Sequence, residues 1–223
     1  MNTKRKILIL ISSPKQGHKC ASWIAGDMLA KALAGNNVES TIINLAALMN
    51  SEKWEENLLC AINGHENVVF SSPINNGGPP SFVIRAMDSL KKNMSKINNS
   101  KGMFAISNCG FPEARQNNSA VNIYRQFAKE SGFSCLGVFA IGMGPMLMYG
   151  RGLVLTILGL NIKKAFSVAA KAIARGEAVP KRAEELISKP IIPVGMYVFK
   201  HNFDIFKNEI MFKLKGITFQ AEN

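Results

Sequence analysis

Five short apolar segments, separated by longer stretches of helical periodicity, constrain the fold of this chain most strongly. The segments span residues 6–12, 38–45, 67–72, 102–107 and 135–142. Each is a nearly continuous hydrophobic run rich in β-branched residues, which is typical of strands that are covered on both faces. Because strands and helices alternate, the sequence predicts right-handed βαβ units and an open parallel sheet with helices on both faces.

The segments between the strands carry apolar residues at helical spacing, and we expect these residues to face the sheet. They are Ala21, Ile24, Met28 and Ala32; Trp54, Leu58 and Ile62; Val83, Met87, Leu90 and Met94; and Val121, Tyr124 and Ala128. After the fifth strand, a glycine-rich loop leads into another predicted helix. Its buried side consists of Ile162, Phe166, Ala169 and Ile173, and it ends at Gly176.

The residues after this last helix exceed what a parallel sheet with helices on both faces needs. We therefore predict a domain over residues 1–178 and an extension over residues 179–223 that packs on the domain or on a partner subunit. In the extension, Pro180 opens a short helix, and a Pro-Ile-Ile-Pro break at 190–193 precedes a further segment. That segment places Phe203, Phe206, Ile210 and Leu214 on one helical side, with lysines elsewhere. A basic amphipathic helix of this kind can cover the core, contact a second subunit or lie on a membrane. We favour core cover or a subunit contact.

Charge and cysteine content limit the class of protein. The 223 residues have a net charge of +12, which predicts attraction to anions such as phosphates, nucleotides or acidic surfaces. The basic excess is denser after residue 150, which marks this part as a contact surface or, alternatively, as a solvated rim. The four cysteines are scattered rather than placed at metal-ligand spacing, so we predict no metal site.

Two apolar stretches are not targeting or membrane segments by our interpretation. The run at 7–11 is shorter than the core of a signal peptide, and we expect a cytoplasmic protein. Residues 134–160 carry a single charge, Arg151, but several glycines and Pro145 interrupt them. We therefore expect no transmembrane segment.

Four loops follow the carboxyl ends of the predicted strands, where open parallel sheets bind their ligands. They span residues 12–20, 72–81, 108–116 and 142–152. The first is polar and basic and leads directly into a helix, which predicts a phosphate site with donors from Ser12, Ser13, Lys15, His18 and Lys19. The alternative is that serine and proline merely cap the helix. The sequence has neither GxGxxG after a strand nor GxxxxGK[ST], so a Rossmann dinucleotide site and a P-loop are not supported.

Three of these loops carry a resemblance to a known family. The sequence SSPK, with Gly17 and His18 before the helix, resembles the phosphate loop of the flavodoxin-like NAD(P)H-dependent FMN reductase family. Residues 68–88 and 105–133 resemble later signatures of that family, and the similarity extends over about residues 6–175. It implies a three-layer α/β/α flavodoxin-like fold with a five-stranded parallel sheet in the order 2-1-3-4-5. FMN would bind at the switch between the first and third strands.

The resemblance also implies which residues bind FMN. They are Ser13, Lys15, His18, Lys19 and Cys20 around the phosphate, Pro73, Ile74, Asn75, Asn76 and Gly77 along the ring system, and Asn108, Cys109 and Gly110 on the third side. Gly77 and Gly78 can adopt positive φ and let the backbone approach the flavin, whose N5 and carbonyl oxygens their N–H groups would contact. The resemblance implies no catalytic side chain, because hydride transfer to a flavin depends on orientation of the two partners.

The chain departs from the family pattern at several positions. Ser12 stands where the family often has glycine, Lys19 and Cys20 partly replace hydroxyl donors, and no aromatic residue occupies position 75 or 76. The missing aromatic face would come from Phe111, Tyr149 or a partner subunit. Cys109 is expected to be a small buried cysteine rather than a reactive thiol.

The resemblance and the charge together predict an FMN-dependent oxidoreductase. It would accept hydride from NADH or NADPH and pass electrons to a small acceptor such as a quinone or a flavin, and we expect a homodimer. The alternatives are a flavodoxin-type electron carrier without its own substrate and an interaction module with a decayed flavin site. Carriers of this type tend to be acidic, so the charge favours the enzyme. Nucleic-acid binding is not predicted, because the net charge is the only feature that favours it.

Overall fold

The structure is a computed structural model that describes residues 5–14, 20–98, 100–148, 159–192, 194–195 and 197–199. The chain divides into two compact units, Met1–Ile191 and Ile192–Asn223. The sheet, all the labelled helices and the candidate site belong to the first unit.

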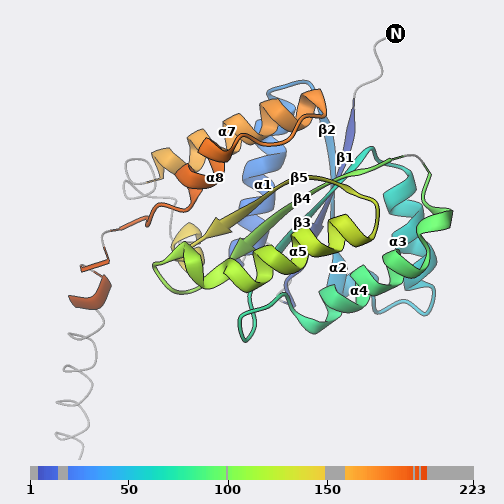
Figure 1. Ribbon diagram of the computed structural model, residues 1–223, viewed down its shortest axis with the longest axis horizontal. Helices are drawn as coiled ribbons and strands as arrows, with labels where there is room; N and C mark the ends of the chain where they lie inside the picture. The colour runs from blue at the N-terminus through green and yellow to red at the C-terminus, as the bar shows by residue number, and fades with distance from the viewer. Residues whose placement is uncertain are drawn as a thin grey trace, which may run out of the picture. The chain divides into compact units, whose positions relative to one another are not determined.

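The first unit contains a five-stranded parallel sheet (Figure 1). Its strands are β1 (Lys6–Ile11), β2 (Glu39–Asn44), β3 (Asn67–Pro73), β4 (Gly102–Asn108) and β5 (Ser134–Ile141). They are arranged in the order β2-β1-β3-β4-β5, and every neighbouring pair is parallel. The predicted strand segments and the predicted order are both confirmed.

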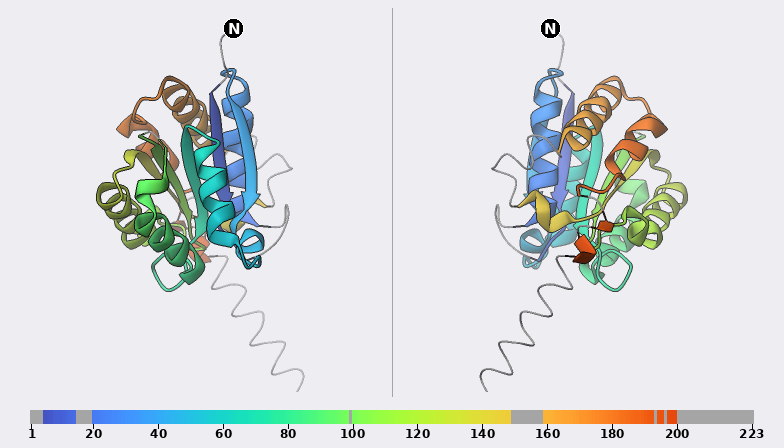
Figure 2. Two further views of the ribbon diagram at one scale, coloured as in Figure 1. Left: turned by 90° about the vertical axis from the view of Figure 1, so that its right-hand side faces the viewer. Right: turned by 90° about the vertical axis from the view of Figure 1, so that its left-hand side faces the viewer.

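Helices cover both faces of the sheet, which gives the predicted three-layer α/β/α arrangement (Figure 2). The longer helices are α1 (Ala21–Ala34), α3 (Trp54–Asn63), α4 (Ser81–Lys92), α5 (Asn118–Glu130), α7 (Leu160–Arg175) and α8 (Lys181–Ile187). Helices α1 and α7 pack on one face, and α3, α4 and α5 pack on the other (Figures 1 and 2). Short elements complete the unit: α2 (Leu45–Leu48), η2 (Met94–Lys96), η3 (Ala114–Asn117) and η4 (Gly144–Leu147).

Aromatic side chains join the layers of the core. On one face, the Phe70 ring lies 6.0 Å from that of Tyr124 and 6.2 Å from that of Phe127. On the other, Phe139 contacts Phe104 at 4.9 Å and Phe166 at 5.5 Å. These edge-to-face and tilted contacts fasten α5 and α7 to opposite sides of the sheet.

The buried face of α1 differs from the predicted one. The predicted positions Ile24, Met28 and Ala32 are only partly buried. The buried positions are Ala21, Ser22, Ala25, Gly26, Leu29 and Leu33. The helix is apolar around most of its circumference, so periodicity alone does not select one face. Small residues select the buried face of α1. The helix approaches β1 so closely that a Cβ at Gly26 would lie 2.5 Å from the Ile11 side chain.

The other predicted apolar stripes lie on buried helix faces. Trp54, Leu58 and Ile62 are buried in α3, and Ile162, Phe166, Ala169 and Ile173 are buried in α7, which ends at Gly176 with a φ of 73°. Met94 is the exception, since it lies beyond the end of α4 and is partly exposed.

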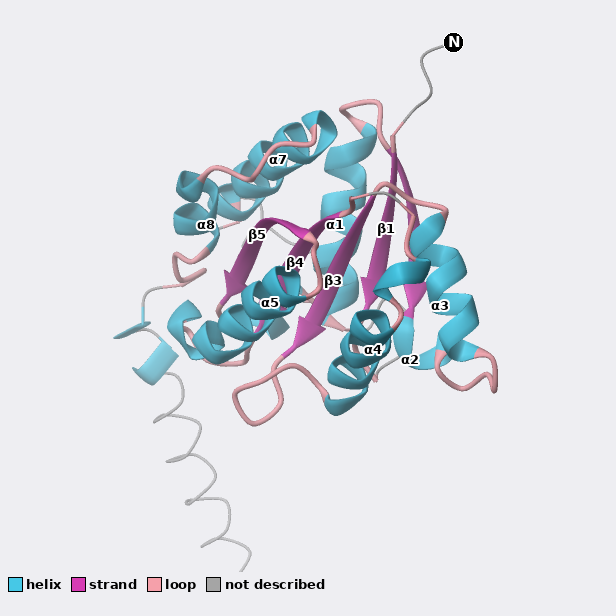
Figure 3. Ribbon diagram, turned by 45° about the vertical axis from the view of Figure 1, so that its right-hand side comes forward, coloured by secondary structure: helices cyan, strands magenta, loops and turns pink. Residues whose placement is uncertain are grey.

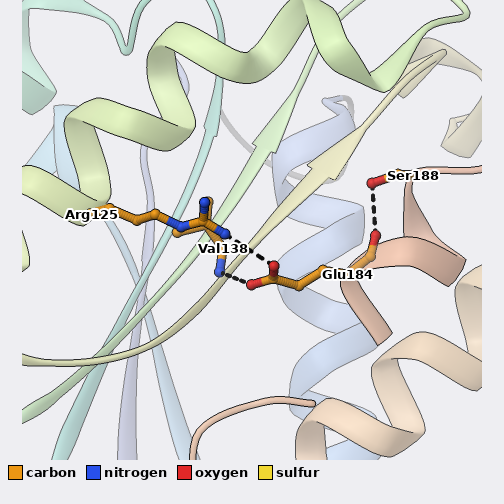
Figure 4. Close-up of polar contacts among 4 residues, drawn as sticks. All are labelled: Arg125, Val138, Glu184 and Ser188. Atoms are coloured by element: carbon orange, nitrogen blue, oxygen red, sulfur yellow. Dashed lines mark hydrogen bonds and ion pairs between the residues drawn. The ribbon is translucent and has the colours of Figure 1, made fainter. Parts of the chain in front are cut away.

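Helix α8 protects the open edge of β5 (Figure 4). The Glu184 carboxylate accepts hydrogen bonds from the Val138 backbone N–H at 3.0 Å and from the Arg125 guanidinium at 3.0 Å. The Val179 N–H donates to the Leu136 carbonyl at 2.6 Å. An unpaired strand edge invites pairing with other chains, and these contacts occupy part of it. Residues 179–191 of the predicted extension thus pack within the first unit.

Among the described residues, we find no helix with the length and hydropathy needed to cross a membrane. The predicted apolar face of Phe203, Phe206, Ile210 and Leu214 lies outside the described residues.

Candidate functional site

A cavity of about 260 Å³ lies at the carboxyl ends of β1, β3 and β4. Its walls come from all four of the loops that the sequence nominated. The lining residues are Ser13, Pro14, Cys20, Ala21, Ser22, Pro73, Ile74, Asn75, Asn108, Cys109, Gly110, Pro145 and Met148. The structure therefore shows that turns far apart in the sequence meet at one rim of the sheet, as predicted.

The first turn of α1 forms one wall of the cavity. Cys20 caps the helix, and its Sγ accepts a hydrogen bond from the Trp23 N–H at 3.4 Å. The next residues, Ala21 and Ser22, also line the cavity. Backbone N–H groups in the first turn of a helix have no intrahelical acceptor and carry the positive end of the helix dipole. This wall therefore favours an anionic group.

Two buried hydrogen bonds fix that turn against the sheet. The Ser71 hydroxyl donates to the Ser22 carbonyl at 2.8 Å, and the Asn108 side-chain amide donates to the Ser22 hydroxyl at 2.9 Å. The same amide nitrogen donates to the Ser72 carbonyl at 2.8 Å. Asn108 is 4% exposed, so these bonds are shielded from water. The ends of β3 and β4 thus set the position of the α1 N-terminus.

The loop after β3 forms a tight turn beyond the strand ends (Figure 3). Asn75 and Gly78 exchange two backbone hydrogen bonds, at 2.7 and 3.1 Å. Between them, Asn76 has a φ of 49° and Gly77 a φ of 85°, which is the type I′ geometry that Asn-Gly favours. By sequence, Gly77 and Gly78 are the two residues of this loop that can adopt positive φ most easily. The structure assigns it to Asn76 and Gly77 instead, because asparagine tolerates the left-handed region.

The loop after β4 is held by a buried asparagine. Asn117 accepts a hydrogen bond from the Ser107 hydroxyl at 2.9 Å and donates to the Ile141 carbonyl at 3.3 Å and to the Cys109 Sγ at 3.3 Å. Burial raises the pKa of the Cys109 thiol, which is 4% exposed. The thiol therefore stays protonated near neutral pH and acts as a packing group, as expected.

The structure brings most of the predicted site residues together. Eight of the thirteen line the cavity: Ser13, Cys20, Pro73, Ile74, Asn75, Asn108, Cys109 and Gly110. Asn76 and Gly77 lie at the tip of the turn and are not among the lining residues. Lys15, His18 and Lys19 lie outside the described residues.

Sequence reasoning missed five lining residues: Pro14, Ala21, Ser22, Pro145 and Met148. Ala21 and Ser22 immediately follow the predicted phosphate loop, so an N-terminal helix site should have included them. Pro145 and Met148 belong to the fourth nominated loop, for which the sequence pattern indicated no role.

The predicted aromatic wall is not present in the described lining. Phe111 is 58% exposed and does not line the cavity, and Tyr149 lies outside the described residues. At the rim, Met148 is 39% exposed. Within the described ranges, we find no group of three or more His, Cys, Asp or Glu side chains that could hold a metal ion.

Comparisons with known proteins support the fold. No family model matches the chain, and no curated protein matches it either. Among solved structures, an FMN-dependent NADH-azoreductase from Bacillus anthracis in complex with FMN is similar, with a TM-score of 0.55 and 13% identity, over 76% of this chain and 100% of that chain. An oxidoreductase from Corynebacterium diphtheriae has a TM-score of 0.53 and 15% identity, over 83% and 98%. A flavodoxin, WrbA-like protein from Agrobacterium tumefaciens has a TM-score of 0.51 and 13% identity, over 78% and 99%.

These similarities, together with the strand order β2-β1-β3-β4-β5, identify the fold as flavodoxin-like. This is the fold that the sequence resemblance implied.

Proposed function

We propose that this protein is an FMN-dependent oxidoreductase that accepts hydride from NADH or NADPH and passes electrons to a small acceptor such as a quinone or a flavin. The observation that carries this proposal is the cavity between the α1 N-terminus and the ends of β3 and β4. In open α/β sheets, ligands bind where the strand order reverses, and here that point lies between β1 and β3.

The residues around the cavity fit FMN at both of its ends. For the phosphate, the first turn of α1 supplies backbone N–H groups, and Ser13 and Ser22 supply hydroxyl groups. For the ring, Pro73, Ile74 and Cys109 supply apolar wall. A Cβ at Gly110 would meet no atom within 4 Å, so the backbone is open to close approach at that point.

The cavity volume indicates how deeply a ligand would be buried. At about 260 Å³ it is slightly smaller than the about 300–1,000 Å³ typical of sites for ligands of drug size. A molecule as large as FMN would therefore extend over the rim near Met148. A half-exposed ring is accessible to a second, planar reactant.

The described lining contains no Asp, Glu, His, Lys or Arg. This described part of the lining would therefore contribute binding, orientation and exclusion of water rather than acid–base catalysis. When bound, FMN itself supplies the hydride acceptance and the electron transfer. Asn108 and Ser22 would hold the phosphate and ring subsites at a fixed separation through their buried hydrogen bond.

The donor and the quaternary structure are parts of the same proposal. A similar structure is of an enzyme named as an NADH-azoreductase, which supports a nicotinamide donor here. A homodimer would supply an aromatic face from the partner, since Phe111 does not line the cavity. The net charge of +12 favours an enzyme with anionic substrates over a flavodoxin-type carrier.

An anaerobic titration tests this function. The purified protein is mixed with FMN, desalted, and examined by visible spectroscopy before and after addition of NADH or NADPH. Retained yellow colour that bleaches rapidly supports the oxidoreductase. Retained colour without bleaching supports a carrier, and a colourless protein supports a module with a decayed flavin site. Gel filtration of the same sample tests the dimer.

A further inference from the structure

A second hollow, of about 330 Å³, lies at the edge of the sheet opposite the flavin cavity. Its lining includes the first residues of three strands, which are Asn67 of β3, Gly102 of β4 and Ser134 of β5. The cavity proposed for FMN lies instead at Pro73 and Asn108, the last residues of β3 and β4. Each of these two strands has 7 residues, so its two ends are about 20 Å apart. The proposed function does not use this second hollow.

Asn67 brings a buried hydrogen-bond donor to the hollow. The residue is 8% exposed, and its Oδ1 accepts a hydrogen bond from the Gly102 N–H at 2.9 Å. Because that bond identifies the oxygen of the amide, the other atom is the Nδ2 donor. Among the residues that the structure describes, Nδ2 has no hydrogen-bond partner. A buried donor without an acceptor is unfavourable, and an oxygen atom bound in the hollow would satisfy it.

Two arginines bring positive charge to the same hollow. The Arg5 Nε lies 3.5 Å from a Glu66 carboxylate oxygen, and its two terminal nitrogens lie beside Gly176, where a Cβ would come within 2.5 and 3.2 Å of them. Arg175, at the end of α7, pairs with Glu177 at 2.9 Å. Both ion pairs are solvent-exposed, and exposed pairs contribute little free energy. A bound anion can therefore compete with these carboxylates for the guanidinium groups.

Lys101 adds a third positive charge, which is buried. The residue is 6% exposed, and its Nζ donates to the His65 carbonyl at 2.6 Å. Burial lowers the pKa of Lys101, and attraction to Glu66 opposes this effect only in part. The charged residues that line the hollow are Arg5, Glu66, Lys101 and Arg175. Even with Glu177 included, positive charge exceeds negative charge here, which favours an anionic ligand.

We propose that this hollow is a second ligand site that binds a phosphate group, either as the free ion or as part of a small ester. One phosphate oxygen accepts a hydrogen bond from Asn67 Nδ2, and the guanidinium groups of Arg5 and Arg175 contact the others. Arginine suits this role because its planar group presents several N–H donors that match phosphate oxygens. The volume of about 330 Å³ lies within the range of about 300–1,000 Å³ that is typical of small-molecule sites.

An NMR titration of the ¹⁵N-labelled full-length protein tests this site. Inorganic phosphate is exchanged for sodium chloride at constant ionic strength, so that general screening of charges does not change. The signal of the Asn67 side-chain amide is identified by its loss in Asn67→Asp. We expect this signal to move downfield and to saturate as phosphate binds. Glycerol 3-phosphate is titrated in the same way, and tighter binding of this compound identifies an ester as the ligand.

Three variants make the result specific. Arg175→Gln should weaken phosphate binding at least about fivefold, because it removes a charge-assisted donor. Arg182→Gln makes the same change at an exposed arginine of α8 that does not line the hollow, and its affinity should be unchanged. Asn67→Asp keeps an acceptor for the Gly102 N–H but replaces the donor with an oxygen. In that variant, phosphate should no longer shift the Gly102 backbone amide signal.

Three results would overturn the proposal. The first is an Asn67 amide signal that neither probe shifts in a saturable way. The second is equal phosphate affinity in Arg175→Gln and Arg182→Gln, which decides the question even where Asn67→Asp does not fold, because both arginines are exposed. The third is a response confined to the signals of Ser22 and its neighbours, which would place the phosphate in the flavin cavity alone.

Discussion

The Asn108 side-chain amide donates a hydrogen bond of 2.9 Å to the hydroxyl of Ser22, a residue 86 positions earlier in the chain. The same nitrogen donates to the Ser72 carbonyl at 2.8 Å. One buried amide therefore connects the end of β4, the end of β3 and the first turn of α1. These are the elements that form the proposed phosphate and ring subsites.

Replacing Asn108 with alanine should weaken both the fold and FMN binding. It removes the side-chain donor that the Ser22 hydroxyl and the Ser72 carbonyl share, which costs about 1–3 kcal/mol of unfolding free energy. It also frees the α1 N-terminus relative to β3, so we expect FMN affinity to fall by more than stability alone explains. Urea unfolding and fluorescence titration with FMN measure the two effects.

Asn93→Ala is the matched control for that experiment. The Asn93 side chain donates to the Ser89 carbonyl at 2.9 Å, at the end of α4 and away from the cavity lining. It should lower stability slightly and leave FMN affinity unchanged. Equal FMN affinity in Asn108→Ala and Asn93→Ala would contradict the role given to Asn108.

Gly110→Leu should block the flavin cavity without unfolding the protein. Gly110 lines the cavity, and a Cβ there would meet no atom within 4 Å. A leucine side chain would fill space that the FMN ring needs, so we expect the affinity for FMN to fall at least about tenfold, while the stability changes by about 0.5 kcal/mol or less. Gly64→Ala is the control, since its Cβ makes ordinary contacts at the end of α3. Undiminished FMN binding by Gly110→Leu would place the ring elsewhere.

The sheet was predictable because each strand is buried on both faces and therefore reads as a continuous apolar run. The helices α3, α4, α5 and α7 were predictable because each has a single apolar stripe. Helix α1 was not, since Ile24 and Met28 offer an apolar stripe as regular as the one that Leu29 and Leu33 form. Close approach of Gly26 to β1 decided between them, and a period in the sequence carries no information about such a contact.

The location of the site was predictable from the strand ends, but its internal connections were not. The bonds from Ser71 and Asn108 to Ser22 join residues far apart in sequence, and polar residues in loops give no sign of their partners. Similarly, Glu184 on α8 contacts Val138 on β5 through a backbone group that any residue would present.

The four cysteines should separate into two classes of reactivity. Cys60 and Cys135 are exposed, whereas Cys20 and Cys109 are buried against the cavity. Because burial raises the pKa of Cys109, its thiolate fraction near neutral pH is small. We expect a disulfide reagent such as DTNB to label two thiols rapidly and two slowly. Serine replacements at Cys60 and Cys135 should remove the fast phase, and FMN should retard the slow one. Rapid labelling of Cys109 would contradict this assignment.

Tyr124 should make the protein sensitive to alkaline pH. Its hydroxyl hydrogen-bonds to that of Ser72 at 2.6 Å, and full burial raises the pKa of Tyr124 well above its ordinary value. Above about pH 10 the unfolded chain loses this proton while the folded chain keeps it, so the unfolding free energy falls as pH rises.

Tyr124→Phe removes that dependence. At pH 7 it should cost about 1 kcal/mol, because the hydrogen bond to Ser72 is lost. Between about pH 10 and 11 its disadvantage should shrink by up to about 1.4 kcal/mol. Ser72→Ala keeps the buried phenol and should retain the alkaline loss, which distinguishes proton linkage from the hydrogen bond. Urea unfolding at pH 7, 9, 10 and 11 provides the comparison.

Glu184 should stabilise the β5 edge more through the backbone than through its ion pair. Its carboxylate accepts from the Val138 N–H and from Arg125, but the Arg125 side chain is 49% exposed, so the ion pair contributes about 1 kcal/mol at most. Glu184→Ala leaves a partly buried N–H without an acceptor and should cost about 1–3 kcal/mol. Glu184→Gln keeps an acceptor oxygen for Val138 and should cost less than half as much. Glu185→Ala, at the exposed neighbouring position, should change stability by about 0.5 kcal/mol or less. Equal losses for Glu184→Gln and Glu184→Ala in urea unfolding would instead assign the stabilisation to the charge.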